Sequence, residues 1–368
     1  MKMPTDAIRE EILKCGEISF ARFMELALYC PETGYYEAKK DNVGRAGDFI
    51  TSVSAGELFG QLLAFQFAEW LDELKTQNEK LQIVEAGAHD GRLAADILNW
   101  LKIHCAELFH QIEYVILEPS MRRQEWQRAT LKIFPNVRWS ENFEGLKNKS
   151  EKLHGVIFGN ELLDAMPVHR FGWDAKASQW FEWGVRLDGG KFTWTRCPNR
   201  ERRHPAGEMP AFSEMPPELL AVLPDGYTIE VSPAAENWWR GAAEILSHGK
   251  LLAIDYGFTA EEQISPARRH GTMRAYHRHH VSDDLLANAG EQDLTAHVNF
   301  SAVQKAGEAA GLRTDHFCTQ PQFLTRILSA AMKKNFFNEW SAKQTRQFQT
   351  LTHPEHLGHA FRVLVQSC

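Results

Sequence analysis

The sequence lacks several features that would direct it to a particular class of protein. Its six cysteines lie far apart without a C-x-x-C pair, which argues against a disulfide framework and against a cysteine zinc site. No apolar run approaches the ~20 residues that span a bilayer. The first residues have neither the apolar stretch of a signal peptide nor the arginine-rich composition of a mitochondrial presequence. We therefore expect a cytoplasmic protein with no membrane association and with buried free thiols.

Motifs of several large enzyme classes are also missing. The sequence has no G-x-S-x-G nucleophile elbow, no G-x-x-x-x-G-K-[ST] phosphate loop and no H-E-x-x-H zinc motif. His277, His279 and His280 lie near Asp283 and Asp284, but adjacent histidines diverge on most backbones, so we expect no metal site. The net charge of −7 gives no reason to expect binding to nucleic acid or to an anionic membrane.

The sequence does contain a regular alternation of strand and helix patterns between residues 80 and 170. We predict strands at 81–85, 112–117, 137–139 and 154–160, and helices at 91–104 and 120–132. This alternation is typical of an α/β fold with a doubly wound parallel sheet, whose ligands bind at the carboxyl ends of the strands. Strand patterns return at 227–231 and 251–254, and a helix is expected at 302–310.

Other parts of the chain surround this predicted sheet. Residues 1–78 form an expected N-terminal helical region, whose loop from Tyr29 to Ala55 is long enough to be suspected of a function. The loop could close as a lid, or it could be a structural turn packed on the sheet. Residues 79–368 form the expected core, with insertions at about 170–226 and 258–299, the latter mostly loop. The first insertion contains a hairpin, because Asp188-Gly189-Gly190 separates strand patterns at 180–187 and 191–195. Its edge would allow a dimer, and the oligomeric state stays open.

The turn after the first predicted strand carries the main indication of a ligand. Glu85, Gly87 and Gly91 lie between that strand and the next helix, where glycine lets the backbone approach a ligand closely. Glu118 ends the second strand, where a carboxylate can bind ribose hydroxyls. Glu85 would repel a pyrophosphate but suits the ammonium of an amino-acid moiety, which favours S-adenosylmethionine over a dinucleotide.

His89 leaves alternatives open at this turn. A dinucleotide fingerprint has glycine at this position, and a positive φ at a histidine would cost ~1 kcal/mol or more. The turn could belong to another α/β protein. It could also belong to a nicotinamide oxidoreductase in which Glu118 binds the NAD ribose, or to a noncatalytic assembly or binding protein with a decayed cofactor site.

Several segments resemble the MidA-type S-adenosylmethionine-dependent methyltransferases, which usually have glycine in place of His89. The segments are, in chain order, 47–52, 58–60, the turn at Glu85 and Gly87, Glu118 with Ser120 and Gln124, 160–168, 254–257, 271–276 and 293–300. The resemblance implies a class I, Rossmann-like methyltransferase sheet that uses S-adenosylmethionine, with a protein substrate methylated on arginine. Mitochondrial members assist complex I assembly, so it also implies a respiratory complex I subunit as a candidate partner.

The resemblance adds candidate site residues. Gly47 and Asp48 lie on the N-terminal loop and would contact the cofactor if that loop closes over it. Asn160 ends the fourth strand of the sheet beside the expected methyl position and is assigned to the cofactor. Glu161 and Asp164 are expected to bind an arginine acceptor, because a carboxylate can hold a planar guanidinium through two hydrogen bonds.

Each candidate for the acceptor site also has a structural interpretation. Glu161 and Asp164 could instead cap a helix N-terminus, where acidic residues are favourable. His297 could be a proton acceptor, a substrate contact or a hydrogen-bonded core residue. The sequence does not decide between these roles.

Overall fold

The chain forms two compact units, each made of segments that are distant in the sequence. The computed structural model describes residues 3–38, 51–74, 80–146, 152–197, 215–277, 280–337, 339–358 and 360–368. The first unit comprises Met1–Asn42, Asp164–Asn237 and Phe258–Val303, and the second comprises Val43–Leu163, Trp238–Gly257 and Gln304–Cys368. Each unit has a hydrophobic core of its own.

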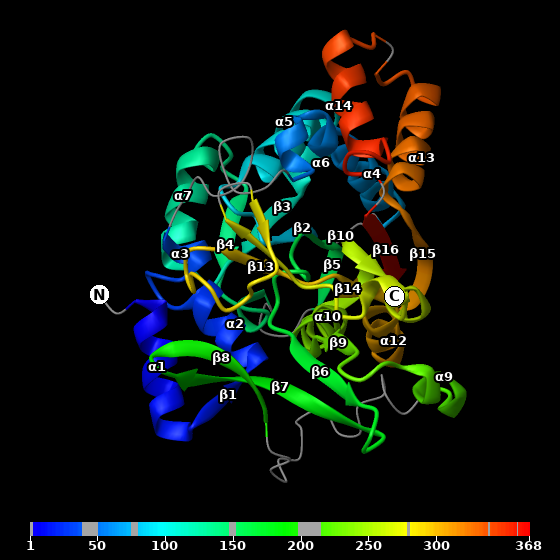
Figure 1. The fold of residues 1–368 in the computed structure, drawn as a ribbon. Coiled ribbons are helices and arrows are strands. Elements are labelled where there is room, and N and C mark those ends of the chain that lie inside the picture. The colour runs from blue at the N-terminus through cyan, green and yellow to red at the C-terminus, as the bar shows by residue number, and fades with distance from the viewer. Residues whose placement is uncertain are drawn as a thin grey trace. The chain divides into compact units, whose positions relative to one another are not determined.

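The second unit contains a largely parallel sheet (Figure 1). Its strands are β2 (Leu81–Ala86), β3 (Glu113–Leu117), β4 (Val137–Ser140), β5 (Leu153–Asn160), β10 (Leu246–Phe258), β15 (Arg313–Thr319) and β16 (Phe361–Ser367). They follow the order β15-β16-β10-β5-β2-β3-β4. The pairs from β4 to β10 are parallel, whereas β16 is antiparallel to both of its neighbours. The carboxyl ends of β2, β3 and β5 therefore lie along the same edge of the sheet.

Helices cover both faces of this sheet, which confirms the predicted α/β class. They include α4 (Leu58–Glu73), α5 (Arg92–His104), α6 (Ala106–Gln111), α7 (Met121–Leu131), α13 (Gln320–Lys333) and α14 (Ala342–Thr352). Phe361, Val363 and Val365 of β16 join the core that α4, α5 and α13 build on one face. Successive side chains of a strand point to opposite faces, so Gln366, which follows Val365, lies on the other face, where it contacts Trp239 of α10 (Pro233–Ile245).

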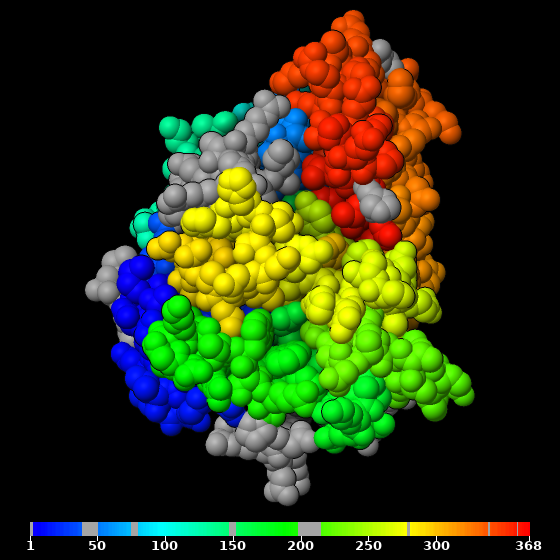
Figure 2. Space-filling model, in the orientation of Figure 1, coloured from blue at the N-terminus to red at the C-terminus, as the bar shows by residue number. Residues whose placement is uncertain are grey.

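Helix α4 lies at the centre of the helical layer. Eleven of its sixteen residues are buried, and α5, α13 and α14 all pack against it. Its polar residues, among them Gln61, Glu69 and Asp72, lie on one face that is only partly buried or exposed. In Figure 2 the surfaces of α13 and α14, in orange and red, adjoin each other at this layer.

The first unit combines N-terminal helices with antiparallel strands. Its helices are α1 (Pro4–Cys15), α2 (Phe20–Tyr29), α3 (Tyr35–Ala38), α9 (Pro217–Val222) and α11 (Ala260–Gln263), and α12 (Phe300–Ala309) begins in it. Its strands are β1 (Glu17–Ser19), β6 (His169–Asp174), β7 (Gln179–Asp188), β8 (Lys191–Arg196), β9 (Thr228–Val231), β11 (Arg274–His277), β12 (His280–Ser282), β13 (Asp293–Thr295) and β14 (Val298–Asn299). One sheet has the order β1-β7-β6-β9, with β8 paired to β7 as the predicted hairpin.

Residues 258–299 differ from the expected mostly looped insertion. They contain a three-stranded antiparallel sheet in the order β12-β11-β13. These strands are only three or four residues long. Strands this short give little periodic signal, which explains why the sequence pattern missed them.

A buried hydrogen-bond network joins β16 to the helices on its outer face. Trp239 Nε1 donates to Gln366 Oε1 (2.7 Å), and both side chains are fully buried. Gln366 Nε2 donates to the Gln304 carbonyl (3.0 Å) and to Thr314 Oγ1 (2.9 Å). The buried indole N–H of Trp239 has the Gln366 amide as its acceptor, whereas Thr314 Oγ1 also donates to Glu308 Oε1 (2.8 Å).

We expect the substitution Gln366→Met to lower the free energy of unfolding by about 2–3 kcal/mol, because it leaves the buried indole N–H of Trp239 without an acceptor. Urea denaturation measures this change. The same substitution is expected to cost clearly less in a Trp239→Phe background, where no indole donor is left unsatisfied. Equal costs in the two backgrounds would contradict the assigned role of this hydrogen bond.

Candidate functional site

The turn between β2 and α5 has the backbone geometry that its glycines allow. Gly87 has φ +76° and Gly91 has φ +83°, in the region that disfavours other residues. A Cβ on Gly87 would lie 3.0 Å from Leu162 Cδ1, and a Cβ on Gly91 would lie 3.2 Å from Leu131 Cδ1. The backbone conformation therefore favours glycine at both positions, and a Cβ at either would be in tight contact with a leucine side chain.

His89 occupies the middle of this turn in a left-handed conformation, with φ +45°. The strain that the sequence suggested for a histidine with positive φ is therefore present, at a cost of ~1 kcal/mol. The imidazole Nδ1 lies 3.8 Å from Asp90 Oδ1, and Asp90 Oδ2 pairs with Arg92 Nε (2.9 Å). Burial alone would raise the pKa of Asp90, but hydrogen bonding to His89 and the charges of His89 and Arg92 lower it.

Glu85 is buried at the end of β2, with 3% of its surface exposed. Its Oε2 accepts a 2.6 Å hydrogen bond from the hydroxyl of Tyr114, which is itself fully buried. Burial raises the pKa of Glu85 to about 8; the Tyr114 hydrogen bond opposes this shift, and the Asp90 and Asp96 charges add to it. The side chain therefore carries a proton at neutral pH in the absence of a ligand. A nearby cation would lower its pKa.

Glu118 follows β3 and is 1% exposed. Its Oε1 accepts a hydrogen bond from the Ser120 N–H (2.9 Å) and pairs with Arg123 Nη2 (3.1 Å). Its Oε2 accepts a hydrogen bond from Gln127 Nε2 (3.2 Å). Residues in the first two turns of α7 therefore hold the carboxylate in one orientation.

Gln127 connects the turn to Glu118, a role that the sequence did not suggest. It is fully buried, and its Nε2 also donates to the His89 carbonyl (3.1 Å). Its Oε1 accepts a hydrogen bond from Trp139 Nε1 of β4 (2.9 Å). A signal was present in the sequence, because Gln124 and Gln127 put two polar residues at helical spacing on a face that apolar residues normally occupy.

The carboxyl end of β5 presents Asn160 and Glu161. Glu161 has φ +51°, and its Oε1 accepts hydrogen bonds from the Ser52 N–H (2.9 Å) and from Asn160 Nδ2 (3.0 Å). Asn160 is 9% exposed, and its Oδ1 has no hydrogen-bond partner among the described residues. Because Leu162 packs on Gly87, this strand end lies next to the β2–α5 turn.

Asp255 of β10 fixes the chain that follows β5. It is fully buried, and its Oδ2 accepts hydrogen bonds from the N–H groups of Leu162 (3.0 Å) and Leu163 (2.7 Å). Its Oδ1 accepts the N–H of Tyr256 (2.8 Å). No role was expected for Asp255 from the sequence, although it lies in the segment 254–257 on which the family resemblance partly rests.

The remaining expected site residues fall elsewhere. Gly47 and Asp48 lie outside the described residues. Asp164 and His297 belong to the first unit, where the carbonyl of Asp164 accepts the N–H of Ala296 (2.9 Å). Within that unit the structure thus brings Asp164 next to the segment that carries His297.

His297 has the surroundings of a hydrogen-bonded, stacked residue. Its ring stacks on Phe258, with centroids 4.7 Å apart and 12° between the planes. Its Nδ1 lies 3.3 Å from the Thr272 carbonyl, which can only accept, so Nδ1 carries the hydrogen. Burial lowers the pKa of His297 to about 4, with the Arg274 and Arg268 charges acting in the same direction. The imidazole is therefore neutral at pH 7 and is a weak base.

Within the described ranges, no group of three or more His, Cys, Asp or Glu side chains is arranged to hold a metal ion. His279 lies outside those ranges. Among the helices that the structure describes, none is both long enough and apolar enough to cross a membrane.

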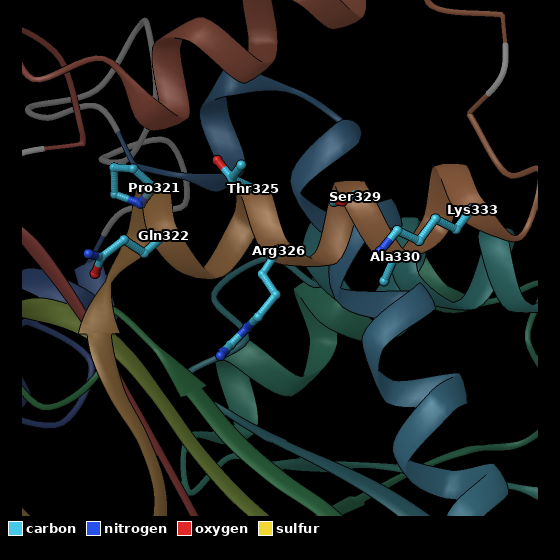
Figure 3. Close-up of a pocket in the computed structure, with 7 residues that line it drawn as sticks. All are labelled: Pro321, Gln322, Thr325, Arg326, Ser329, Ala330 and Lys333. Carbon is cyan, nitrogen blue, oxygen red and sulfur yellow. The ribbon is translucent and has the colours of Figure 1, made fainter.

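A surface depression runs along α13, away from the strand ends described above. Figure 3 shows its lining residues, which recur at helical spacing: Pro321, Gln322, Thr325, Arg326, Ser329, Ala330 and Lys333. All of them come from one helix, so within the described parts of the chain no other element forms an opposing wall. It lacks the enclosure that a nucleoside site needs, and we assign it no function.

Comparisons with known proteins agree on one family. The family model described as "Putative S-adenosyl-L-methionine-dependent methyltransferase" matches residues 62–318. The chain is 26% identical over 385 residues to the Drosophila melanogaster protein arginine methyltransferase NDUFAF7 homolog, mitochondrial, covering 97% of this chain and 83% of that protein. It is 26% identical over 384 residues to the Homo sapiens protein arginine methyltransferase NDUFAF7, mitochondrial, covering 95% and 80%.

A solved structure matches over nearly the whole chain. It is a "likely methyl transferase" from Burkholderia thailandensis bound to S-adenosyl-homocysteine, with a TM-score of 0.83 and 31% identity, covering 99% of this chain and 92% of that one. A native structure of an uncharacterized protein of the same superfamily and organism gives a TM-score of 0.80 at 31% identity, covering 99% and 91%.

These relatives contradict the expected cytoplasmic location. The names of the fly, mouse and human relatives place those proteins in mitochondria. The expectation was drawn from the composition of a few N-terminal residues, and that composition was too little to fix a compartment. It was wrong.

The comparisons also decide between the two cofactors, S-adenosylmethionine and a nicotinamide dinucleotide, that the sequence of the glycine turn allowed. The matching family and the ligand of the Burkholderia structure both identify S-adenosylmethionine, not a nicotinamide dinucleotide, as the cofactor. The turn, the carboxylate after β3 and the polar end of β5 lie together in the second unit, within the matched range. The chain belongs to the family of S-adenosylmethionine-dependent methyltransferases.

Proposed function

We propose that this protein transfers the methyl group of S-adenosylmethionine to an arginine side chain of a protein substrate. The main support is Glu161, a carboxylate at the carboxyl end of β5 in a left-handed conformation next to the cofactor turn. Strained residues of this kind cluster at functional sites. The curated relatives, named protein arginine methyltransferases, favour arginine as the acceptor. A respiratory complex I subunit is the candidate substrate that the family resemblance suggests.

We assign the cofactor contacts to the second unit. Gly87 and Gly91 give the turn the positive φ values with which its backbone can approach a ligand. Glu118 is the proposed partner of the ribose hydroxyls, and Glu85 that of the amino-acid ammonium. The unpartnered Asn160 Oδ1 fits a ligand donor, because a buried acceptor is costly unless it is hydrogen bonded.

The residues present can support methyl transfer to nitrogen. The cofactor supplies an electrophilic methyl group on a sulfonium. Glu161 would hold the guanidinium through hydrogen bonds, orient one nitrogen for attack and take the proton that this nitrogen loses. Gly47 and Asp48 remain predicted cofactor contacts, and Asp164 and His297 remain predicted acceptor-site residues.

We expect Glu161→Gln to lower kcat for arginine methylation by about 10²–10⁴-fold, because the amide can still accept from Ser52 but cannot take a proton. Purified respiratory complex I and arginine-containing peptides, with radiolabelled donor, serve as acceptors. Affinity for S-adenosylhomocysteine is expected to stay unchanged, and Glu107→Gln on α6 is the control. If the wild-type protein binds the cofactor product but methylates no arginine in either acceptor, the proposal fails and a binding role takes its place.

Glu118→Ala is expected to weaken S-adenosylhomocysteine binding by roughly 10–100-fold, because a hydrogen bond to a charged group contributes about 1.5–3 kcal/mol. Isothermal calorimetry gives the affinity, and a thermal melt without ligand checks that the domain remains folded. Glu107→Ala, which removes an exposed carboxylate from the same unit, is the control. Unchanged affinity in a folded Glu118→Ala protein would exclude the ribose contact.

The affinity for S-adenosylhomocysteine is expected to rise with pH between about 6 and 8 and to level off above 8. Below its pKa of about 8, Glu85 is protonated in the free protein and must release a proton to pair with the ligand ammonium. The slope is at most tenfold per pH unit. Calorimetry in buffers of different ionisation enthalpy should detect the released proton, and Glu85→Gln should abolish both effects. A wild-type affinity that is flat over this range would contradict the ammonium contact.

A further inference from the structure

We propose that Gln127 is a positioning residue of the cofactor site, which holds the β2–α5 turn and the Glu118 carboxylate in the arrangement that the cofactor ribose requires. The inference rests on the proposed ribose contact of Glu118. Gln127 need not touch the ligand, because it acts through the His89 carbonyl and the Glu118 carboxylate.

The contacts of Gln127 come from three neighbouring strand ends. Its amide N–H groups reach the His89 carbonyl after β2 and the Glu118 carboxylate after β3, and its amide oxygen accepts from Trp139 on β4. A planar amide with both ends engaged cannot rotate without breaking a buried hydrogen bond. Of the natural side chains of this length, glutamate cannot donate and methionine can do neither, so the chemistry specifies glutamine.

The close packing of the turn on α7 makes these contacts possible. A Cβ on Gly91 would lie 3.5 Å from the Cα of Gln127 and closer still to Leu131. This close packing of α7 on the turn brings Gln127 within hydrogen-bond distance of the His89 carbonyl. The hydrogen bond in turn helps to offset the strain of a histidine with positive φ, at ~1 kcal/mol.

Gln127 also fixes the orientation of the Glu118 carboxylate by donating a hydrogen bond to its second oxygen. Ser120 and Arg123 both contact Oε1, and Gln127 Nε2 donates to Oε2. Without Gln127 the carboxylate can turn its second oxygen toward the guanidinium of Arg123, since carboxylates favour bidentate pairing with arginine. A carboxylate engaged in that way offers fewer lone pairs to ribose hydroxyls. Loss of Gln127 would therefore weaken the hydrogen bonds between Glu118 and the ribose hydroxyls.

The test compares two ligands that differ in one hydroxyl, S-adenosylhomocysteine and its 2′-deoxy analogue. We expect the wild-type protein to prefer the first by about tenfold or more, and Gln127→Met to reduce this preference to below about threefold. Gln124→Met is the matched control, because Gln124 is buried on the same helix and donates to the backbone carbonyl of Glu118 instead of its carboxylate (2.9 Å). The control is expected to keep the wild-type preference.

A residue with a structural role alone would change stability but not this preference. Wild-type discrimination in a folded Gln127→Met protein, or an equal loss in Gln124→Met, would overturn the inference. Failure of the ribose assignment itself gives a different result, because Glu118→Ala would then keep the wild-type preference. If Gln127→Met does not fold, the comparison is made in a His89→Gly background, where the turn no longer needs the carbonyl tether, and the same outcomes apply.

Discussion

The carboxylate of Asp255 makes the hydrogen bonds on which the candidate site depends. A fully buried carboxylate is stable when its oxygens are satisfied, and here three backbone N–H groups satisfy them. Two of these groups belong to Leu162 and Leu163, directly after β5. The N–H of Glu161 bonds to the Ile254 carbonyl of the neighbouring strand. The polar end of β5 is thus held by the sheet itself and not by a free loop.

The same site stores backbone strain in two places. His89 and Glu161 both have positive φ, on either side of the packed pair Gly87 and Leu162. Each costs roughly 1–3 kcal/mol and persists because the surroundings over-determine it. The His89 backbone is held by the hydrogen bond from Gln127 of α7, and the Glu161 backbone is held by the pairing of β5 with β10. Rigid elements therefore supply both constraints, which suits a site that must align a donor and an acceptor.

The sequence predicted the α/β sheet well because alternating strand and helix patterns persist over about ninety residues. It also located the glycine turn and the carboxylate after β3, since both depend on local order along the chain. Gln127 and Asp255 were missed because their roles arise from contacts between elements, which periodicity does not reveal. The proton on Glu85 depends on burial beside Tyr114. Each unit is built from three separate chain segments, and this division was not predictable because it depends on pairing between strands that are distant in the sequence.

Leu162 has a consequence for how this family of sequences can vary. Its two methyl groups lie over two glycines, one in the turn after β2 and one on β5, because a Cβ on Gly87 would meet Cδ1 at 3.0 Å and a Cβ on Gly159 would meet Cδ2 at 2.8 Å. One side chain thus occupies the volume that either glycine would need in order to grow. A larger residue at position 159 is compatible with this backbone only when position 162 becomes smaller, whereas position 87 also needs glycine for its φ of +76°. Positions 159 and 162 are therefore expected to co-vary in evolution.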